Sequence, residues 1–169
     1  MAAGDIKLAY GASSALTITL ASLATDANLL TGRESDGVDN TVNLYPDYLL
    51  SGFVTTGTTP TTLKEIRVYV VGLMEDATYP DVFDGTDSAE TISGVGTRDG
   101  IGKVATVIPT IATSNLAYYF GPVSVASLFG GVMPKKFVVF ITHNTAVNLN
   151  STAGNHAIYI TPVFSKIEA

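Results

Sequence analysis

The sequence has no cysteine, no tryptophan and only two histidines among its 169 residues. Without cysteine the chain can form no disulfide and has neither a thiolate metal ligand nor a thiol nucleophile, although this absence does not identify a cellular compartment. Charge is also scarce, because Lys, Arg, Asp and Glu make up 14% of the residues, against about 25% in an ordinary soluble domain. Neutral threonine, serine and asparagine must therefore cover much of the surface.

The few charges are unevenly placed. Fifteen acids against nine bases give a net charge of −6, which argues against DNA or RNA as a partner, since phosphate binding needs clustered Lys and Arg. Residues 104–165 contain only two charged side chains, Lys135 and Lys136, so this region is either core or contact surface. Six acids instead share one segment that has no base, and its proline and glycine indicate a loop. These six are Glu75, Asp76, Asp81, Asp84, Asp87 and Glu90.

The length and the hydrophobic content predict a single folded domain over residues 1–169. Hydrophobic residues make up 46% of the chain, and a chain of this length buries about 70% of its unfolded surface. The charge-free run 116–133 has about the length of a membrane span. Glycine, proline and serine interrupt it, however, and its first residues alternate as in a strand. Residues 15–23 show similar alternation, which argues against a signal peptide. We therefore expect no membrane partner.

Alternating hydrophobicity indicates about eight strands. Leu16, Ile18 and Leu20 alternate with small or polar residues, a pattern typical of a strand with one buried side. Seven further stretches are rich in β-branched and aromatic residues, and turn-forming residues separate most of them. They lie at residues 6–10, 48–56, 65–73, 103–111, 117–125, 137–143 and 157–164.

Helical signals are weak, because Gly, Thr, Val and Ile are frequent and no long segment keeps helical spacing. We expect one helical turn at residues 125–129 and flexible turns in the glycine-rich segment 94–102. Two connections, residues 24–45 and the acidic loop with the glycines behind it, are too long for hairpins. Such crossings are typical of jelly rolls. We predict an all-β, two-sheet antiparallel jelly-roll sandwich of about eight strands, with an immunoglobulin-like sandwich as the alternative.

Catalytic chemistry has few candidate residues. Only His143 and His156 are suited to act as bases or imidazole ligands near neutral pH, and each stands beside an asparagine near a predicted strand end. We interpret both as polar residues on a loop rim. The sequence has no Gly-x-Ser-x-Gly nucleophile motif, and two histidines are few for a metal site. We therefore expect a protein that is not an enzyme, with no catalytic residue, metal site or cofactor.

The acidic loop has two interpretations. Its carboxylates and loop carbonyls are the oxygen ligands that calcium prefers. The spacing of Asp81, Asp84 and Asp87 nevertheless does not follow the EF-hand pattern of alternate ligands with a distal glutamate. We favour a solvated loop whose repulsion limits uncontrolled association.

The charge-poor region holds a row of large apolar residues that strand alternation cannot hide in one core. Exposed aromatics with almost no charge around them are typical of a protein contact surface. The alternative is that the second sheet buries them all. An isolated pair of lysines suits the carboxylates of a partner, and residues 1–12, with their small side chains, suit an extended N-terminal arm along a neighbour. The predicted interface consists of Tyr118, Tyr119, Phe120, Leu128, Phe129, Lys135 and Lys136.

Several short runs resemble small proteins encoded among the structural genes of tailed bacteriophages. They are Arg33-Glu34-Ser35, Val38-Asp39-Asn40, Tyr79-Pro80-Asp81-Val82, Asp84-Gly85-Thr86-Asp87-Ser88, Gly121-Pro122-Val123-Ser124-Val125, Pro134-Lys135-Lys136 and Thr142-His143-Asn144. The likeness extends to about Phe164 and is to capsid decoration, or cement, proteins. The resemblance implies a jelly-roll subunit that forms dimers or trimers on the outer face of an icosahedral shell, where it contacts the major capsid protein and bridges capsomers. It brings no catalytic residues.

Two functions from different classes therefore stay open. The first is a non-enzymatic virion protein on the capsid exterior, assembled in the bacterial cytoplasm, whose linked copies gain avidity from many weak contacts. The second is a carbohydrate- or receptor-binding module of a phage tail or fibre, because outward aromatic rings stack on sugars and an acidic loop suits calcium. The scarcity of histidine and cysteine disfavours a third function, a hydrolase or metal enzyme.

Overall fold

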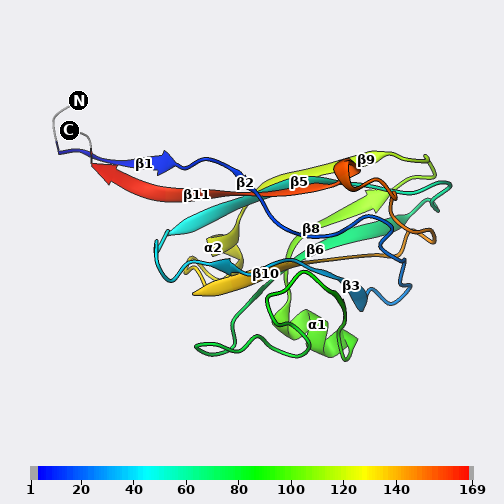
Figure 1. The fold of residues 1–169 in the computed structure, drawn as a ribbon, viewed down its shortest axis with the longest axis horizontal. Coiled ribbons are helices and arrows are strands. Elements are labelled where there is room, and N and C mark those ends of the chain that lie inside the picture. Colours follow the sequence, from blue (N-terminus) through cyan, green and yellow to red (C-terminus); the bar gives the residue numbers. More distant parts are fainter. Residues whose placement is uncertain (1–3, 168–169) are drawn as a thin grey trace.

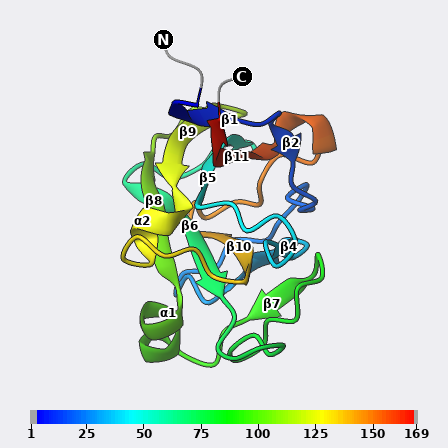
Figure 2. The same ribbon diagram turned by 90° about the vertical axis from the view of Figure 1, so that its left-hand side faces the viewer.

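The computed structural model describes residues 4–167, which fold into two antiparallel β-sheets packed face to face (Figures 1 and 2). Sheet A has the strand order β1-β11-β5-β9, and a short strand, β2, also pairs with β11. Its strands are β1 (Ile6–Tyr10), β2 (Ser14–Ala15), β5 (Asp47–Thr55), β9 (Ala117–Ser124) and β11 (Ala157–Ile167).

Sheet B has the strand order β7-β3-β10-β6-β8, with β4 also paired to β10. Its strands are β3 (Thr31–Glu34), β4 (Val38–Asp39), β6 (Lys64–Gly72), β7 (Ala89–Thr91), β8 (Lys103–Thr110) and β10 (Lys136–His143). The helical segments of the described chain are short. They are α1 (Val95–Ile101), α2 (Val125–Leu128) and the 3-10 turn η1 (Ala153–Asn155).

The strand order is that of a jelly roll. Among the eight strands of four or more residues, sheet A holds the first, eighth, third and sixth in that order. Sheet B holds the second, seventh, fourth and fifth. The prediction of an all-β, two-sheet antiparallel jelly roll with about eight strands is confirmed. The three shorter strands β2, β4 and β7 extend the two sheets.

Seven of the predicted strands are present, with ends that differ by one to three residues or not at all. The prediction of a strand from Leu16 to Ala21 is wrong. Its alternating burial is real, because Leu20 is buried and Ile18 packs against the core. The segment is nevertheless extended chain outside the ladder. The N–H of Leu16 donates to the carbonyl of Ile158 in β11 (2.8 Å), and the carbonyl of Thr17 accepts the N–H of Asp36 (2.9 Å). The eighth strand is β3, inside the long connection 24–45.

The main core lies between the sheets, where each strand contributes alternate side chains. Leu50 of β5 and Ile158 of β11 meet Ile66 of β6 and Phe137 of β10 there. Sheet B is also covered on its other face, so that β10 is buried from Phe137 to His143. The residues of this second cluster are Tyr69, Val71, Phe83, Ile92, Val138 and Phe140.

The predicted helical turn is present as α2, where the Ser124 hydroxyl accepts a bond from the N–H of Ser127 (3.1 Å). The expectation that residues 94–102 form only flexible turns is wrong, since α1 occupies most of them. Glycines disfavour a helix here, but Arg98 anchors it to the body. Its guanidinium lies 5.9 Å from the ring centre of Tyr69 and donates to the carbonyl of Asn28 (3.0 Å). No helix in residues 4–167 has the length and apolarity needed to cross a bilayer.

One end of sheet A is a two-stranded ribbon. The pairing of β11 with β5 ends at Val163, whereas its pairing with β1 continues until Ile167 lies opposite Ile6. Figure 1 shows this ribbon reaching out past sheet B. Part of the predicted arm, residues 1–12, is therefore a strand of the chain's own sheet, while residues 1–3 lie outside the described residues. Contact of the arm with a neighbour stays a prediction.

Candidate contact surface

The outer face of sheet A carries almost no charge. Its side chains alternate along the strands with core residues such as Leu50 and Ile158. Where the described parts of β5, β9 and β11 lie side by side, Asp47 is the single Lys, Arg, Asp or Glu. Its Oδ1 accepts bonds from the N–H groups of Tyr48 and Ala126, both 2.8 Å long. A partner that covers this face therefore has few charges to strip of water.

Aromatic side chains line a shallow groove on this face. Tyr119 of β9 is 75% exposed and Tyr159 of β11 is 38% exposed. Phe53 comes from β5, the strand between them, and its ring centre lies 5.3 Å from that of Tyr119. Gly121 has a φ of +84°, and a Cβ there would lie 2.4 Å from the carbonyl oxygen of Leu50. The groove has a volume of about 450 Å³, and its lining residues are Ser51, Gly52, Phe53, Tyr119, Phe120, Gly121 and Tyr159.

The predicted aromatic row divides between the core and this face. Tyr118 and Phe120 pack against the main core, as do Leu128, the last residue of α2, and Phe129, which follows it. Tyr119 points outward, as the alternation in β9 requires. The prediction that some members face outward is therefore met by Tyr119. Phe53 and Tyr159 are not among the residues predicted from the sequence, although their outward positions follow from the same alternation in β5 and β11.

The predicted basic pair faces carboxylates of its own chain. Lys135 pairs with Asp76 at the surface. Lys136 lies 2.8 Å from Asp39 and, together with Thr41, holds the pKa of that carboxyl well below its usual range. A partner's carboxylate would have to compete with these contacts. Tyr119 is thus the predicted residue that is most clearly available to a partner.

The outer face of sheet B is covered by residues 73–102, here called the acidic insert, which include β7 and α1. Phe83 of the insert packs edge-on against Phe140 of β10, with ring centres 5.4 Å apart. Ile92 joins the same cluster beside Tyr69 and Val71. The interpretation of this segment as a solvated loop is therefore wrong for the insert as a whole. It holds for its tip at residues 74–78, which is exposed.

Two carboxylates attach the acidic insert to the body. Glu34 of β3 is fully buried, and its Oε1 accepts the N–H of Gly85 (2.7 Å) and of Asp84 (3.2 Å). Burial raises the pKa of Glu34 to about 7 despite these bonds. Asp87 accepts bonds from the Arg33 Nε (2.6 Å) and from the hydroxyl of Thr19 (2.6 Å). Burial pushes the pKa of Asp87 upward, but these bonds outweigh it and hold the pKa below its ordinary value.

The acids of the insert are engaged within the chain rather than gathered into one site. No group of three or more His, Asp or Glu side chains in residues 4–167 is placed to hold a metal ion. Each of the six acids accepts a bond from a side chain of this chain or from its backbone. The pairs are Glu75 with Thr78, Asp76 with Lys135, Asp81 with Ser93, Asp84 with Thr86, Asp87 with Arg33, and Glu90 with Ser88.

Both histidines take part in structural hydrogen bonds. His143 is fully buried in β10, so its interpretation as a loop-rim residue is wrong. Its Nε2 donates to the carbonyl of Leu23 (3.0 Å), Nδ1 lies 2.9 Å from the Thr145 hydroxyl, and burial lowers its pKa to about 4. His156 is partly buried, and its Nε2 donates to the carbonyl of Asn150 (2.9 Å). Burial lowers the pKa of His156 too, so both imidazoles are neutral at pH 7.

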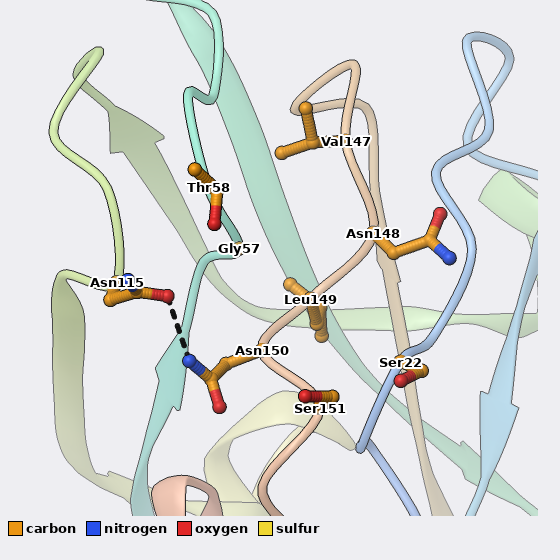
Figure 3. A pocket seen from close by; sticks show the side chains of 9 residues that line it. All are labelled: Ser22, Gly57, Thr58, Asn115, Val147, Asn148, Leu149, Asn150 and Ser151. Atoms are coloured by element: carbon orange, nitrogen blue, oxygen red, sulfur yellow. Dashed lines mark hydrogen bonds between the residues drawn. The ribbon is translucent and has the colours of Figure 1, made fainter.

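A second hollow, of about 280 Å³, lies between loops at one end of the sandwich (Figure 3). Asn150 donates to the Oδ1 of Asn115 (2.8 Å), and the two side chains reach toward each other in Figure 3. Asn150 Oδ1 also accepts the N–H of Thr152 (2.9 Å), so its amide is committed within the chain. The hollow contains no charged group or base. It is lined by Ser22, Gly57, Thr58, Asn115, Val147, Asn148, Leu149, Asn150 and Ser151.

A scan of the sequence against models of known families gave no match, and neither did searches of curated proteins and of solved structures. The jelly-roll assignment accordingly rests on the strand order itself. Function has to be inferred from the chain's own residues and from the open face of sheet A.

Proposed function

We propose that this protein is a non-enzymatic structural component of a tailed-phage virion, which binds the outer surface of the capsid and bridges neighbouring capsomers. Its partner in this proposal is the major capsid protein. The resemblance of the sequence to decoration proteins supports it, as does the jelly-roll fold. The observation that carries it is the ion-poor outer face of sheet A, with its aromatic groove around Tyr119.

The physical basis is burial of aromatic surface against a second polypeptide. Tyrosine combines a large apolar ring with a hydroxyl able to find a new hydrogen-bond partner, and it is enriched at the centres of interfaces. Tyr119 and Phe53 already pack on each other, so little side-chain freedom is lost when they are covered. Several copies that bind one shell together would turn a modest contact into a durable one.

The non-enzymatic part of the proposal rests on the residues available for chemistry. His143 is buried away from solvent, and both imidazoles are held by backbone carbonyls. The open groove of sheet A is lined by aromatic rings, glycine and a single serine, with no Asp, Glu, His, Lys or Arg among them. Such a lining suits recognition of a partner, and it has no imidazole or carboxylate to act as a base near neutral pH.

The test is binding of the full chain to purified expanded capsids of its own virus. The proposal expects saturable binding at symmetry-defined positions, visible by cosedimentation and by electron microscopy. Tyr119→Asp, which places a charge in the groove, should weaken binding at least tenfold. Val132→Asp, at a similarly exposed apolar residue in the loop before β10, should bind as the wild type does. Failure of the wild type to bind, or equal behaviour of the two variants, overturns the proposal.

The same groove supports a second candidate function, a carbohydrate- or receptor-binding module of a phage tail or fibre. The specific observation is the exposed ring of Tyr119 with Phe53 and Tyr159 nearby, because sugar faces stack on aromatic rings. A glycan array followed by calorimetry tests it, with loss of binding in Tyr119→Ala as the expected result. Calcium titration tests the calcium-dependent form, which requires a rise in melting temperature that EDTA reverses.

A further inference from the structure

The edge of sheet A exposes a strand whose apolar side chains have no cover. Ile6, Leu8 and Tyr10 of β1 are 73%, 62% and 60% exposed. They lie on the strand of the ribbon that extends past sheet B in Figure 1. At Ile6 and Leu8, β11 no longer has β5 on its other side, whereas Tyr10 lies opposite Val163, the last residue of β11 that pairs with β5. An isolated two-stranded ribbon is marginally stable, and an exposed apolar edge strand readily pairs with another chain.

The same three residues present the free backbone groups of this edge. The N–H of Gly11 donates to the carbonyl of Pro162 across the β1–β11 pair (2.9 Å). Since N–H groups of alternate residues in a strand point to the same side, Lys7 and Ala9 also face β11. Ile6, Leu8 and Tyr10 therefore direct their N–H and C=O groups away from β11, toward the open edge.

We propose that β1 is a self-association edge, at which the β1 strands of two copies pair antiparallel about a two-fold axis through Leu8. In this register Leu8 lies opposite Leu8 of the second copy, and Ile6 lies opposite Tyr10. Every outward N–H of one strand then meets an outward C=O of the other. The two A sheets become one continuous sheet, and the paired side chains of Ile6, Leu8 and Tyr10 form a single apolar row.

A second copy of the chain fits this edge because the N–H and C=O groups of one β1 strand match those of an identical antiparallel strand. The outward residues are symmetric about Leu8, as an isologous two-fold contact requires. Charge also permits the approach. The ribbon carries Asp5, Lys7 and Lys166, whereas the acids that account for the net charge of the chain lie in the insert on sheet B. The inference goes beyond the proposed function and does not depend on what the groove of sheet A binds.

A single introduced cysteine tests the register, because the wild type has none. Residues directly opposite in a hydrogen-bonded antiparallel pair have Cα atoms about 5.5 Å apart, a distance that a disulfide spans. Under mild oxidation, Leu8→Cys should form a crosslinked dimer in nearly full yield. Ala9→Cys, whose sulfurs would be out of register, should crosslink at least tenfold more slowly. Equal crosslinking of the two variants, or none in Leu8→Cys, overturns the proposed pairing.

Light scattering coupled to size-exclusion chromatography tests the association without a covalent bond. The wild type should elute with twice the mass of one chain. Leu8→Pro, which removes an outward N–H while leaving the bonds to β11, should elute as a folded monomer. Tyr119→Lys, a control on the opposite edge strand of the same sheet, should stay dimeric. A monomeric wild type at all concentrations, or a dimeric Leu8→Pro, overturns the inference. Capsid binding is measured separately, so failure of one proposal leaves the other standing.

Discussion

Sheet A and sheet B each have an outer face, but the described chain covers only that of sheet B. There, Phe83 and Ile92 of the acidic insert close over the sheet, and the buried Glu34 attaches the insert from below. On sheet A, Tyr119 and Tyr159 stay open to solvent. The strands of sheet B carry nine Lys, Arg, Asp or Glu residues, against three in those of sheet A. The nine are Arg33, Glu34, Asp39, Lys64, Glu65, Arg67, Glu90, Lys103 and Lys136.

This difference indicates that the charged side chains of this protein lie mainly where the chain makes contacts with itself. The ion pair Arg33–Asp87, for example, fixes the acidic insert against β3. The two charged groups lose water when the chain folds, so no binding partner has to remove it. A face that another molecule covers gains from having few ions to desolvate. The ion-poor stretch 104–165 thus corresponds to the strands that supply Tyr119 and Tyr159 as well as to the core.

The largest expected effect comes from removing the cover of sheet B. Phe83→Ala should lower the free energy of unfolding by about 4 kcal/mol, because it leaves a cavity over Phe140 in a closed cluster. Urea denaturation followed by circular dichroism measures the change. If Phe83→Ala is nearly neutral, the insert does not stabilise sheet B and the contrast between the faces fails.

A pH series should expose the opposed titrations of Glu34 and His143. His143 has a native pKa of about 4, below its ordinary 6.5, so stability falls as the pH drops between these values. Glu34 has a native pKa of about 7, above its ordinary 4.5, so its contribution is full below pH 4.5 and is lost as the pH rises through 7. The two slopes oppose each other from pH 4.5 to 6.5.

The variant Glu34→Gln removes one of these titrations. When the pH falls from 6.5 to 4, the free energy of unfolding of Glu34→Gln should drop by about 3 kcal/mol more than that of the wild type, because in the wild type protonation of Glu34 offsets part of the loss caused by His143. Calorimetric melting at half-unit pH steps measures this. Parallel profiles for the two proteins would show that Glu34 does not take up a proton within the fold.

A smaller loss of stability is expected from removing the ion pair that holds the acidic insert against β3. Asp87→Ala should cost about 2 kcal/mol, because it removes the carboxylate that accepts from the partly buried Arg33 Nε and from the Thr19 hydroxyl. Asp76→Ala, at the exposed tip of the insert, should leave the unfolding midpoint unchanged, since its pair with Lys135 is solvated. Equal losses in the two variants would contradict the assignment of Asp87 as an anchor.

The smallest effect on stability is expected on the open face. Tyr119→Ala should change the free energy of unfolding by less than about 0.5 kcal/mol, because its ring is largely in solvent. The same variant should nevertheless lose capsid binding. A stability loss as large as that of Phe83→Ala would show that Tyr119 serves the fold rather than a partner.

The sequence predicts most of the sandwich, because strands such as β5 and β9 carry their own alternation of buried and exposed side chains. It does not reveal β3, whose residues Thr31–Glu34 include one glycine and no large apolar side chain. That strand is defined by its partner β10. The glycines of α1 likewise conceal a helix that Arg98 fixes from outside the local sequence.

The candidate site is predictable in part. Alternation shows that neighbouring residues in β9 point to opposite sides, but only the pairing with β5 decides that Tyr119 faces out and meets Phe53. The cover of sheet B is hidden from the sequence, because the acids of the insert suggest solvent while its Phe83 and Ile92 supply the packing. The burial of His143 is also hidden from the sequence, because its ring is held by Leu23 and Thr145, which lie in connecting segments outside β10.

The packing of apolar clusters on both faces of sheet B determines the order in which parts of the molecule unfold. Strand β10 has neighbours on both edges and apolar layers above and below it. Its amide protons exchange with solvent only when nearly the whole domain opens, whereas those at the outer edge of β1 exchange through local fraying. Amide exchange is therefore expected to be slow in β10, which maintains the fold, and fast at the edge of β1, whose backbone groups are available for new contacts.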